Sequence, residues 1–313
     1  NTTYKSGTVT ANFTYNTPGL HTFKFVVITD TNEEIEYITE KNIVAKAEPT
    51  FEVFKSDGTV IAENSTTKLS SDDTVLRFTF TDAANTIYKT QRIYVNNVVY
   101  DFPSEQTIDF ATLKRGYYIV KIELKTEYET ITKTYYVLDD GINLLAENVE
   151  AEPIRVTIPN SVFLFGQTYN TLNIAAPGII SPTNHYHAFS LQEVTNIQQY
   201  NQLILPVQTW DSWYYSSGSI SKIYYKNYID NLTLYIDAYD PKGNRVFYSV
   251  AFYNRDILKF NYYIVEGSYA EKLLAGVSYD STEDNSFIIT NTKNNSIKDN
   301  TSVTVDTYRM LAN

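Results

Sequence analysis

Apolar and polar residues alternate with a period of two through most of the 313-residue chain. In VLRFTFT, at 75–81, Leu76, Phe78 and Phe80 alternate with polar positions. Successive side chains of a β-strand point to opposite faces, so this period predicts strands that bury one face. The pattern therefore favours a chain built from β-strands.

The composition supports the same fold class. The chain contains 28 Tyr and 16 Phe, and it is 43% hydrophobic and 19% charged. Tyr, Phe, Thr, Val and Ile favour pleated, half-buried surfaces, and this apolar content is sufficient for a folded core. We expect an all-β protein.

One segment is repeated at the spacing of a domain. FTYNTPGLHTFKFVVITD (13–30) aligns with IDFATLKRGYYIVKIELKTE (108–127) when Gly19 is placed on Gly116. The two glycines are about 97 residues apart, close to the roughly 100 residues of an immunoglobulin-type sandwich. The alignment places Phe23, Phe25 and Val27 on Val120, Ile122 and Leu124. A repeat of this kind predicts tandem modules, each closed by the same β-hairpin.

Both copies begin with a glycine turn. Pro18-Gly19 is typical of a tight turn in which glycine adopts a positive φ. In the second copy we expect Gly116 to take the same part without the proline.

The repeat and its turns give the predicted domains. Hairpin turns at Asp57-Gly58 and Asn96-Asn97 complete an immunoglobulin-like module over 48–140. Residues 1–47 match only the C-terminal half of such a module, so we expect an incomplete sandwich with an exposed inner face. The missing strands would come from preceding chain or from another molecule, and the first source is favoured.

The first copy resembles the closing hairpin of PKD-type immunoglobulin-like repeats. The shared features are an aromatic pair, Pro18-Gly19, an alternating strand and a terminal Asp30, whereas the second copy lacks the proline and the aspartate. Modules of this kind occur in bacteriophage virion and bacterial surface proteins. The resemblance implies a spacer or an adhesive unit.

Residues 141–313 differ from the preceding part of the chain in having longer turns, rich in Asn, Pro and Ser. About ten strands and the hairpin turn DPKGN at 240–244 predict a larger, jelly-roll-like β-sandwich. Short helical turns are expected in NLLAENV (143–149) and in EGSYAEKLLAG (266–276). Asp139 and Asp140, at the domain boundary, are expected on a solvated face.

An aromatic segment, TWDSWYYSSGSISKIYYKNY (209–228), is the main candidate for ligand binding. Exposed Tyr and Trp rings can stack on sugars while their polar tips remain hydrated. The alternative is core packing across strands, in which Tyr224 and Tyr225 would take part. Both interpretations stay open, and the candidate ligand residues are Trp210, Trp213, Tyr214 and Tyr215.

Other constellations give weaker signals. His185 and His187 would share a strand face, but a metal needs a third ligand and the remaining histidine is His21. Asp237, Asp240 and the segment at 279–286 offer oxygens without a glycine-punctuated calcium loop. No nucleophile elbow or phosphate-binding loop is present in the sequence. We expect no metal, no cofactor and no enzymatic activity.

The net charge, the hydropathy and the cysteine content restrict the possible functions. A net charge of −11 argues against nucleic acid and anionic membranes, and no apolar run reaches the roughly 20 residues of a membrane span. The absence of cysteine excludes disulfides. We expect a structural or adhesive component of a larger assembly, in a virion or at a cell surface. It would contact protein partners, and it could form a homo-oligomer.

Three functional hypotheses remain. The first is a bacteriophage virion protein, such as a head decoration, a fibre or a tail component. The second is a bacterial surface adhesin. The third is a carbohydrate-binding module that holds a glycan with aromatic residues of the C-terminal domain.

Overall fold

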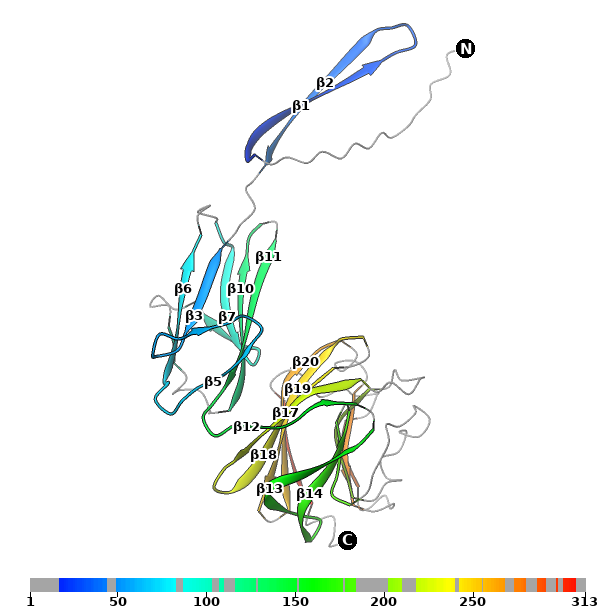
Figure 1. Cartoon of the computed structure of the whole chain (residues 1–313). Helices are drawn as coiled ribbons and strands as arrows, with labels where there is room; N and C mark the ends of the chain where they lie inside the picture. Colours follow the sequence, from blue (N-terminus) through cyan, green and yellow to red (C-terminus); the bar gives the residue numbers. More distant parts are fainter. Residues whose placement is uncertain are drawn as a thin grey trace. The chain divides into compact units, whose positions relative to one another are not determined.

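The chain is an all-β protein in the computed structural model shown in Figure 1. Every helix or strand assigned in the described residues is a β-strand, which confirms the predicted fold class. Among these residues, no helix is long and apolar enough to cross a bilayer. The described residues are 17–43, 49–82, 87–102, 107–109, 116–127, 129–150, 152–176, 178–183, 202–209, 218–239, 242–254, 256–267, 273–279, 286–290, 297 and 301–307.

β1 (Gly19–Ile28) and β2 (Glu34–Ile43) form an antiparallel hairpin that is paired along its whole length. Gly19 has a φ of 131°, as its predicted turn requires. Because two strands cannot enclose a core, the hairpin leaves large apolar side chains of both its faces in solvent. The exposed apolar residues are Leu20, Phe25, Val26, Val27, Ile28, Ile35, Tyr37 and Ile38.

Residues 50–138 form two sheets, which we call the smaller sandwich. One sheet has the order β4-β3-β6-β9 and the other has the order β5-β11-β10-β7-β8. β5 pairs with β11 in parallel, whereas β10 pairs antiparallel with β7 and β11. The strands are β3 (Thr50–Phe54), β4 (Val60–Ile61), β5 (Thr66–Lys68), β6 (Val75–Thr81), β7 (Thr90–Val95), β8 (Val98–Asp101), β9 (Thr107–Asp109), β10 (Tyr117–Lys125) and β11 (Thr130–Leu138).

Local sequence signals of the smaller sandwich are confirmed. Leu76 and Phe78 in β6 are buried, and Arg77 between them is exposed. Asn96 and Asn97 both have positive φ, 47° and 64°, as a two-residue type I′ hairpin requires. The alternation and the turn residues therefore fixed these elements locally.

The second copy of the repeat is also an antiparallel hairpin, formed by β10 and β11. The role predicted for Gly116 is wrong, however, because its φ is not in the positive range. A Cβ at this position would lie 3.0 Å from the Tyr235 hydroxyl, and Tyr235 is buried. Gly116 is needed there for close approach to a ring rather than for a turn.

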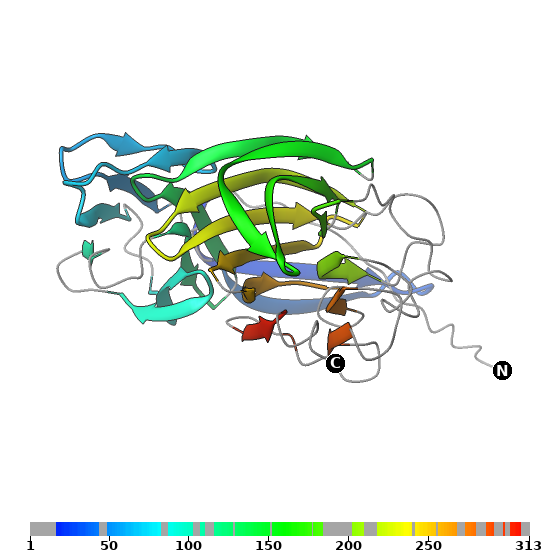
Figure 2. The same ribbon diagram turned by 90° about the horizontal axis from the view of Figure 1, so that it is seen from below.

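Residues 143–306 form two six-stranded sheets, which we call the larger sandwich. Their orders are β12-β17-β18-β19-β20-β23 and β13-β14-β15-β16-β21-β22. Figures 1 and 2 show β17 to β20 side by side in shades of yellow, as their antiparallel pairing requires. The strands are β12 (Asn143–Val149), β13 (Ile154–Leu164), β14 (Gln167–Ala175), β15 (Ile179–Ser181), β16 (Leu203–Thr209), β17 (Ser219–Asn227), β18 (Asn231–Tyr239), β19 (Arg245–Tyr253), β20 (Ile257–Val265), β21 (Leu273–Ser278), β22 (Ser286–Thr290) and β23 (Thr301–Asp306).

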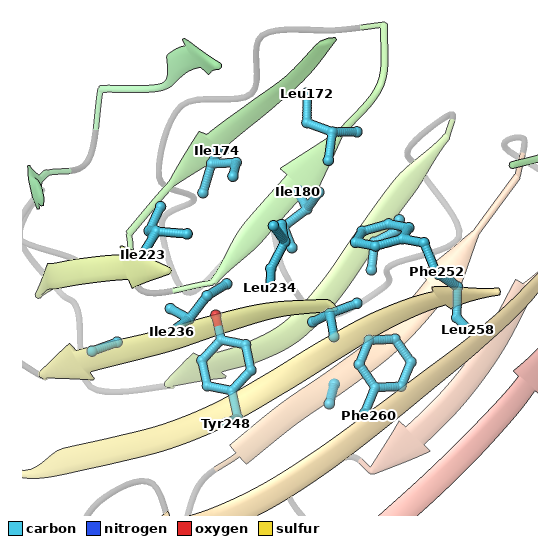
Figure 3. Packing of buried hydrophobic residues seen from close by; sticks show 14 of the residues in the cluster. Leu172, Ile174, Ile180, Ile223, Leu234, Ile236, Tyr248, Phe252, Leu258 and Phe260 are labelled. Carbon is cyan, nitrogen blue, oxygen red and sulfur yellow. The ribbon is translucent and has the colours of Figure 1, made fainter. Parts of the chain in front are cut away.

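Branched and aromatic side chains fill the space between these two sheets. In Figure 3, Leu172, Ile174 and Ile180 face residues of the opposite sheet. All labelled members are almost completely shielded from solvent, so this cluster supplies much of the hydrophobic stabilisation. The opposing residues are Ile223, Leu234, Ile236, Tyr248, Phe252, Leu258 and Phe260.

The helical prediction for 143–149 is wrong, and the one for 266–276 is wrong over its last four residues. NLLAENV is β12, and it pairs antiparallel with β17 through a bulge between Leu144 and Ala146. Residues 273–276 belong to β21, while 268–272 lie outside the described residues. Leu and Ala are good helix formers, but intrinsic propensity is a small term, and pairing with a sheet edge outweighs it here.

Candidate functional site

Two of the aromatic residues in the 209–228 segment belong to the core. Tyr224 is 3% exposed, and its ring centroid lies 5.1 Å from that of Tyr117. Tyr225 is half-buried against the core of the larger sandwich. The core interpretation is thus confirmed for this pair. The predicted ligand residues Trp210, Trp213, Tyr214 and Tyr215 lie outside the described residues.

The metal candidates are not brought together in the described part of the chain. His185, His187 and Asp240 lie outside it. Within the described ranges, no group of three His, Asp or Glu residues is close enough to hold an ion. Asp237, one of the candidate oxygen donors, instead pairs with Arg245.

The smaller and larger sandwiches meet through a buried cluster, which we call the junction. Tyr117 and Ile119 at the start of β10 project away from the core of their own sandwich and pack on the outer face of β17 to β20. The Tyr117 ring meets Phe247 edge to face, with 4.6 Å between centroids. The other members of the junction are Leu138, Ile142, Tyr224, Tyr235 and Ile264.

A bidentate ion pair lies beside this cluster. Arg245 donates from Nε and Nη2 to the two carboxylate oxygens of Asp237, each over 2.7 Å. Both side chains are at most 10% exposed. The guanidinium also lies over the ring of Tyr136 from β11, 5.0 Å from its centroid. The carboxylate of Asp237, from the neighbouring strand of the same sheet, therefore orients the guanidinium, and the stacked ring of Tyr136 carries the contact to the smaller sandwich.

A second contact fixes the connection between the sandwiches. Lys226 Nζ donates to Asp139 Oδ2 over 2.6 Å and to the Asp140 carbonyl over 2.8 Å. Asp139 is 7% exposed, so its predicted place on a solvated face is wrong. Lys226, from the larger sandwich, lies over the turn that contains Asp139. Its ion pair with Asp139 compensates for the cost of burying that carboxylate.

A groove of about 590 Å³ opens next to the junction. Its floor is the outer face of β18, β19, β20 and β23, and its wall includes the β7–β8 hairpin. Eight tyrosines contribute to the lining, together with short polar side chains. These tyrosines are Tyr100, Tyr117, Tyr118, Tyr228, Tyr235, Tyr253, Tyr262 and Tyr263.

The wall is held in place by Asn96. Its amide nitrogen donates to the Tyr117 carbonyl over 3.1 Å, and its amide oxygen accepts from the Ile119 nitrogen over 2.8 Å. The Asn96 backbone nitrogen also donates to the Ile119 carbonyl. The tip of the β7–β8 hairpin is therefore bonded to the same strand that enters the junction.

The floor carries a chain of polar groups across three strands. Ser302 Oγ donates to Asn261 Oδ1 over 2.9 Å, and Asn261 Nδ2 donates to Ser249 Oγ over 3.1 Å. Ser249 Oγ and Tyr263 Oη lie 3.1 Å apart. A bulge in β20 opposite Phe247 and Tyr248 places Tyr263 on this outer face.

Three tyrosine hydroxyls of the groove stay protonated at neutral pH. Burial raises the pKa of Tyr228, Tyr235 and Tyr263 above the usual value. Tyr228 Oη and Tyr235 Oη share a hydrogen bond of 2.8 Å. A protonated phenol both donates and accepts, so these groups can serve sugar hydroxyls as well as one another.

The groove carries a single charged residue, Lys259, among its described lining residues. Lys259 on β20 is half-buried in the lining, and it has no ion pair with any residue in the described ranges. No Asp or Glu is among the described residues of the lining. A chain with a net charge of −11 therefore presents a locally cationic, aromatic groove.

Sequence reasoning missed this site, although signals of it exist. In YYIVKIEL the outward positions Tyr117 and Ile119 are apolar, whereas Lys121 and Glu123 further along the strand are polar. In β19 the sequence VFYSVAF, at 246–252, has no regular alternation of apolar and polar residues, and eight consecutive residues of the strand are buried. A strand without alternation indicates that both of its faces are covered. The sequence thus marks a second buried face without naming its partner.

Comparison with known proteins adds no assignment. No protein-family model matches the chain, and neither the curated proteins nor the solved structures contain a significant match.

Proposed function

We propose that the chain is a non-enzymatic structural and adhesive component of a larger assembly. A bacteriophage virion protein, as a head decoration, a fibre or a tail component, is the first candidate, and a bacterial surface adhesin is the second. The observation that carries the proposal is the junction, beside which Arg245 of the larger sandwich, held by Asp237, stacks on Tyr136 of the smaller one.

A stiff junction suits a structural role. Domains joined by a small polar interface usually move relative to one another, whereas a buried apolar interface holds them fixed. Such an interface is provided by Tyr117, Ile119, Tyr224 and Phe247. The stacking of Arg245 on Tyr136 adds a preferred orientation. A tandem pair of this kind can set a fixed spacing in an assembly.

The strand order supports immunoglobulin-like character for the smaller sandwich. Neighbours β3-β6-β9 in one sheet and β7-β10-β11 in the other match the orders A-B-E and C-F-G of that fold. This arrangement is common in spacer and adhesive modules, so it favours the proposal by analogy of fold.

The test is the location of the natural protein. We expect antibodies against this chain to label particles or intact cell surfaces in immunogold electron microscopy. Co-sedimentation with nuclease-resistant particles would identify a virion component, and removal by protease treatment of intact cells would identify an adhesin. A monomer that sediments alone from the cell interior would overturn both.

Carbohydrate binding is a second function, favoured by the groove, to which Tyr228 of the segment at 209–228 contributes. The groove combines partly exposed tyrosine rings with amide and hydroxyl groups, which is the chemistry that sugar recognition uses.

A further inference from the structure

The groove between the β7–β8 hairpin and the outer face of β18, β19, β20 and β23 has the size of a ligand site. Its volume of about 590 Å³ lies within the ~300–1,000 Å³ of typical small-molecule sites. The wall and floor are tied together through Asn96 and the junction, so the groove is formed before any ligand arrives. Preorganisation of this kind lowers the entropic cost of binding.

Aromatic rings are available for stacking. Tyr100 in β8 is 38% exposed, and Tyr228, Tyr253 and Tyr263 are half-buried. Tyrosine offers an apolar ring face and a polar edge, and the C–H face of a pyranose ring packs well on such a surface. A flat aliphatic ligand would use the rings but would leave the adjacent hydroxyl and amide groups unpaired.

Polar groups line the same surface. Asn231, Asn261, Ser302 and the hydroxyl of Tyr263 present donors and acceptors close to the rings. Because neutral amides and hydroxyls both donate and accept, they match the hydroxyl groups of a saccharide. Phosphate would call for several cations or backbone N–H groups, and the lining supplies Lys259 as its charged residue.

Lys259 determines which saccharides the groove favours. Lys259 has no carboxylate beside it in the described lining, so its ammonium can pair with an anionic group of a ligand. We propose that this groove binds a short saccharide carrying a carboxylate, which pairs with Lys259 while the sugar rings stack on tyrosines that include Tyr253. The inference rests on the adhesive part of the proposed function and names its ligand class.

The experiment measures binding by titration calorimetry with the whole 313-residue chain. The probes are tetragalacturonate and its carboxyl-reduced, neutral counterpart, and 3′-sialyllactose and lactose form a second pair. We expect the acidic member of one pair to bind at least about tenfold more tightly than its neutral partner, with affinity falling as salt rises. The two pairs distinguish an internal uronic acid from a terminal sialic acid.

Variants assign the binding to the groove. Lys259→Gln should lower affinity for the acidic probe about tenfold, to the level of the neutral one, whereas Tyr253→Ala should weaken binding of both. Lys125→Gln makes the same charge change at the far, exposed end of β10 and should have no effect. Circular dichroism and thermal melts confirm that each variant is folded.

The proposal is overturned if neither acidic probe binds at millimolar concentration, or if acidic and neutral probes bind equally. It is also overturned if binding survives both groove variants unchanged. Neither result would affect labelling of particles or cell surfaces, so failure of this site is distinguishable from failure of the assembly role.

Discussion

Replacing Asp237 with Asn tests whether the buried ion pair holds the junction. The substitution keeps the size of the side chain but leaves the Arg245 guanidinium without its counter-charge, in a site where both groups are at most 10% exposed. Removing one partner of a buried pair costs about 3–5 kcal/mol. With a urea dependence of about 3 kcal/mol/M, the unfolding midpoint should fall by about 1–1.7 M.

The assay is urea unfolding followed by circular dichroism and tyrosine fluorescence. Arg245→Met should cost a similar amount, because it strands the carboxylate. The double variant Asp237→Asn/Arg245→Met should lose less than the sum of the two single changes, by about 2–3 kcal/mol, since no buried charge is left unpaired.

An exposed pair provides the control. Lys133 and Glu63 lie 2.7 Å apart, with side chains about one-third exposed. Lys133→Met should cost no more than about 1 kcal/mol. The reasoning is refuted if Asp237→Asn costs as little as this control, or if the two single changes at the junction are additive.

Three further predictions concern the groove wall, the junction and a buried carboxyl. Asn96→Gly keeps the positive φ but removes two hydrogen bonds, so it should lower stability by about 1–3 kcal/mol in urea melts. No measurable loss of stability would contradict this. Gly116→Ala should lower the free energy of unfolding by about 1–3 kcal/mol, because the new methyl group clashes with the buried Tyr235 hydroxyl. Adding Tyr235→Phe should recover part of that loss, and no recovery would show that the clash lies elsewhere. Burial raises the pKa of Asp256, so ionisation of this carboxyl should cost stability as pH rises from about 4 through its folded-state pKa. Asp256→Asn should remove that loss, and urea midpoints at pH 4, 5.5 and 7 should show the difference growing in favour of the variant; a difference that stays constant with pH would be the contrary result.

Local features of the smaller sandwich were predictable because they depend on neighbours in sequence. The alternation in β6 sets which side chains are buried, and Asn96-Asn97 sets a two-residue turn through its tolerance of positive φ. The two glycine-led hairpins, β1–β2 and β10–β11, were found from the same kind of signal.

Predictions failed where a distant element supplied the deciding contact. Gly116 looked like a turn glycine until the ring of Tyr235, over a hundred positions further along, came to lie against it. The sequence indicates a solvated Asp139, but in the fold Lys226 covers this side chain and pairs with it. NLLAENV has helix-compatible residues, but a sheet edge offered it hydrogen bonds as β12.

The sequence by itself determined an all-β chain, the positions of many strands and turns, and an acidic surface without cysteine. Only the tertiary structure decided which outer faces meet, that Asp237 pairs with Arg245, and that tyrosines from β8, β18, β19 and β20 gather around Lys259. The physical reason is the distance along the chain over which each interaction acts. Side-chain period and turn conformation are set within a few residues, whereas the burial of a second sheet face depends on surfaces that come together only when the chain has folded.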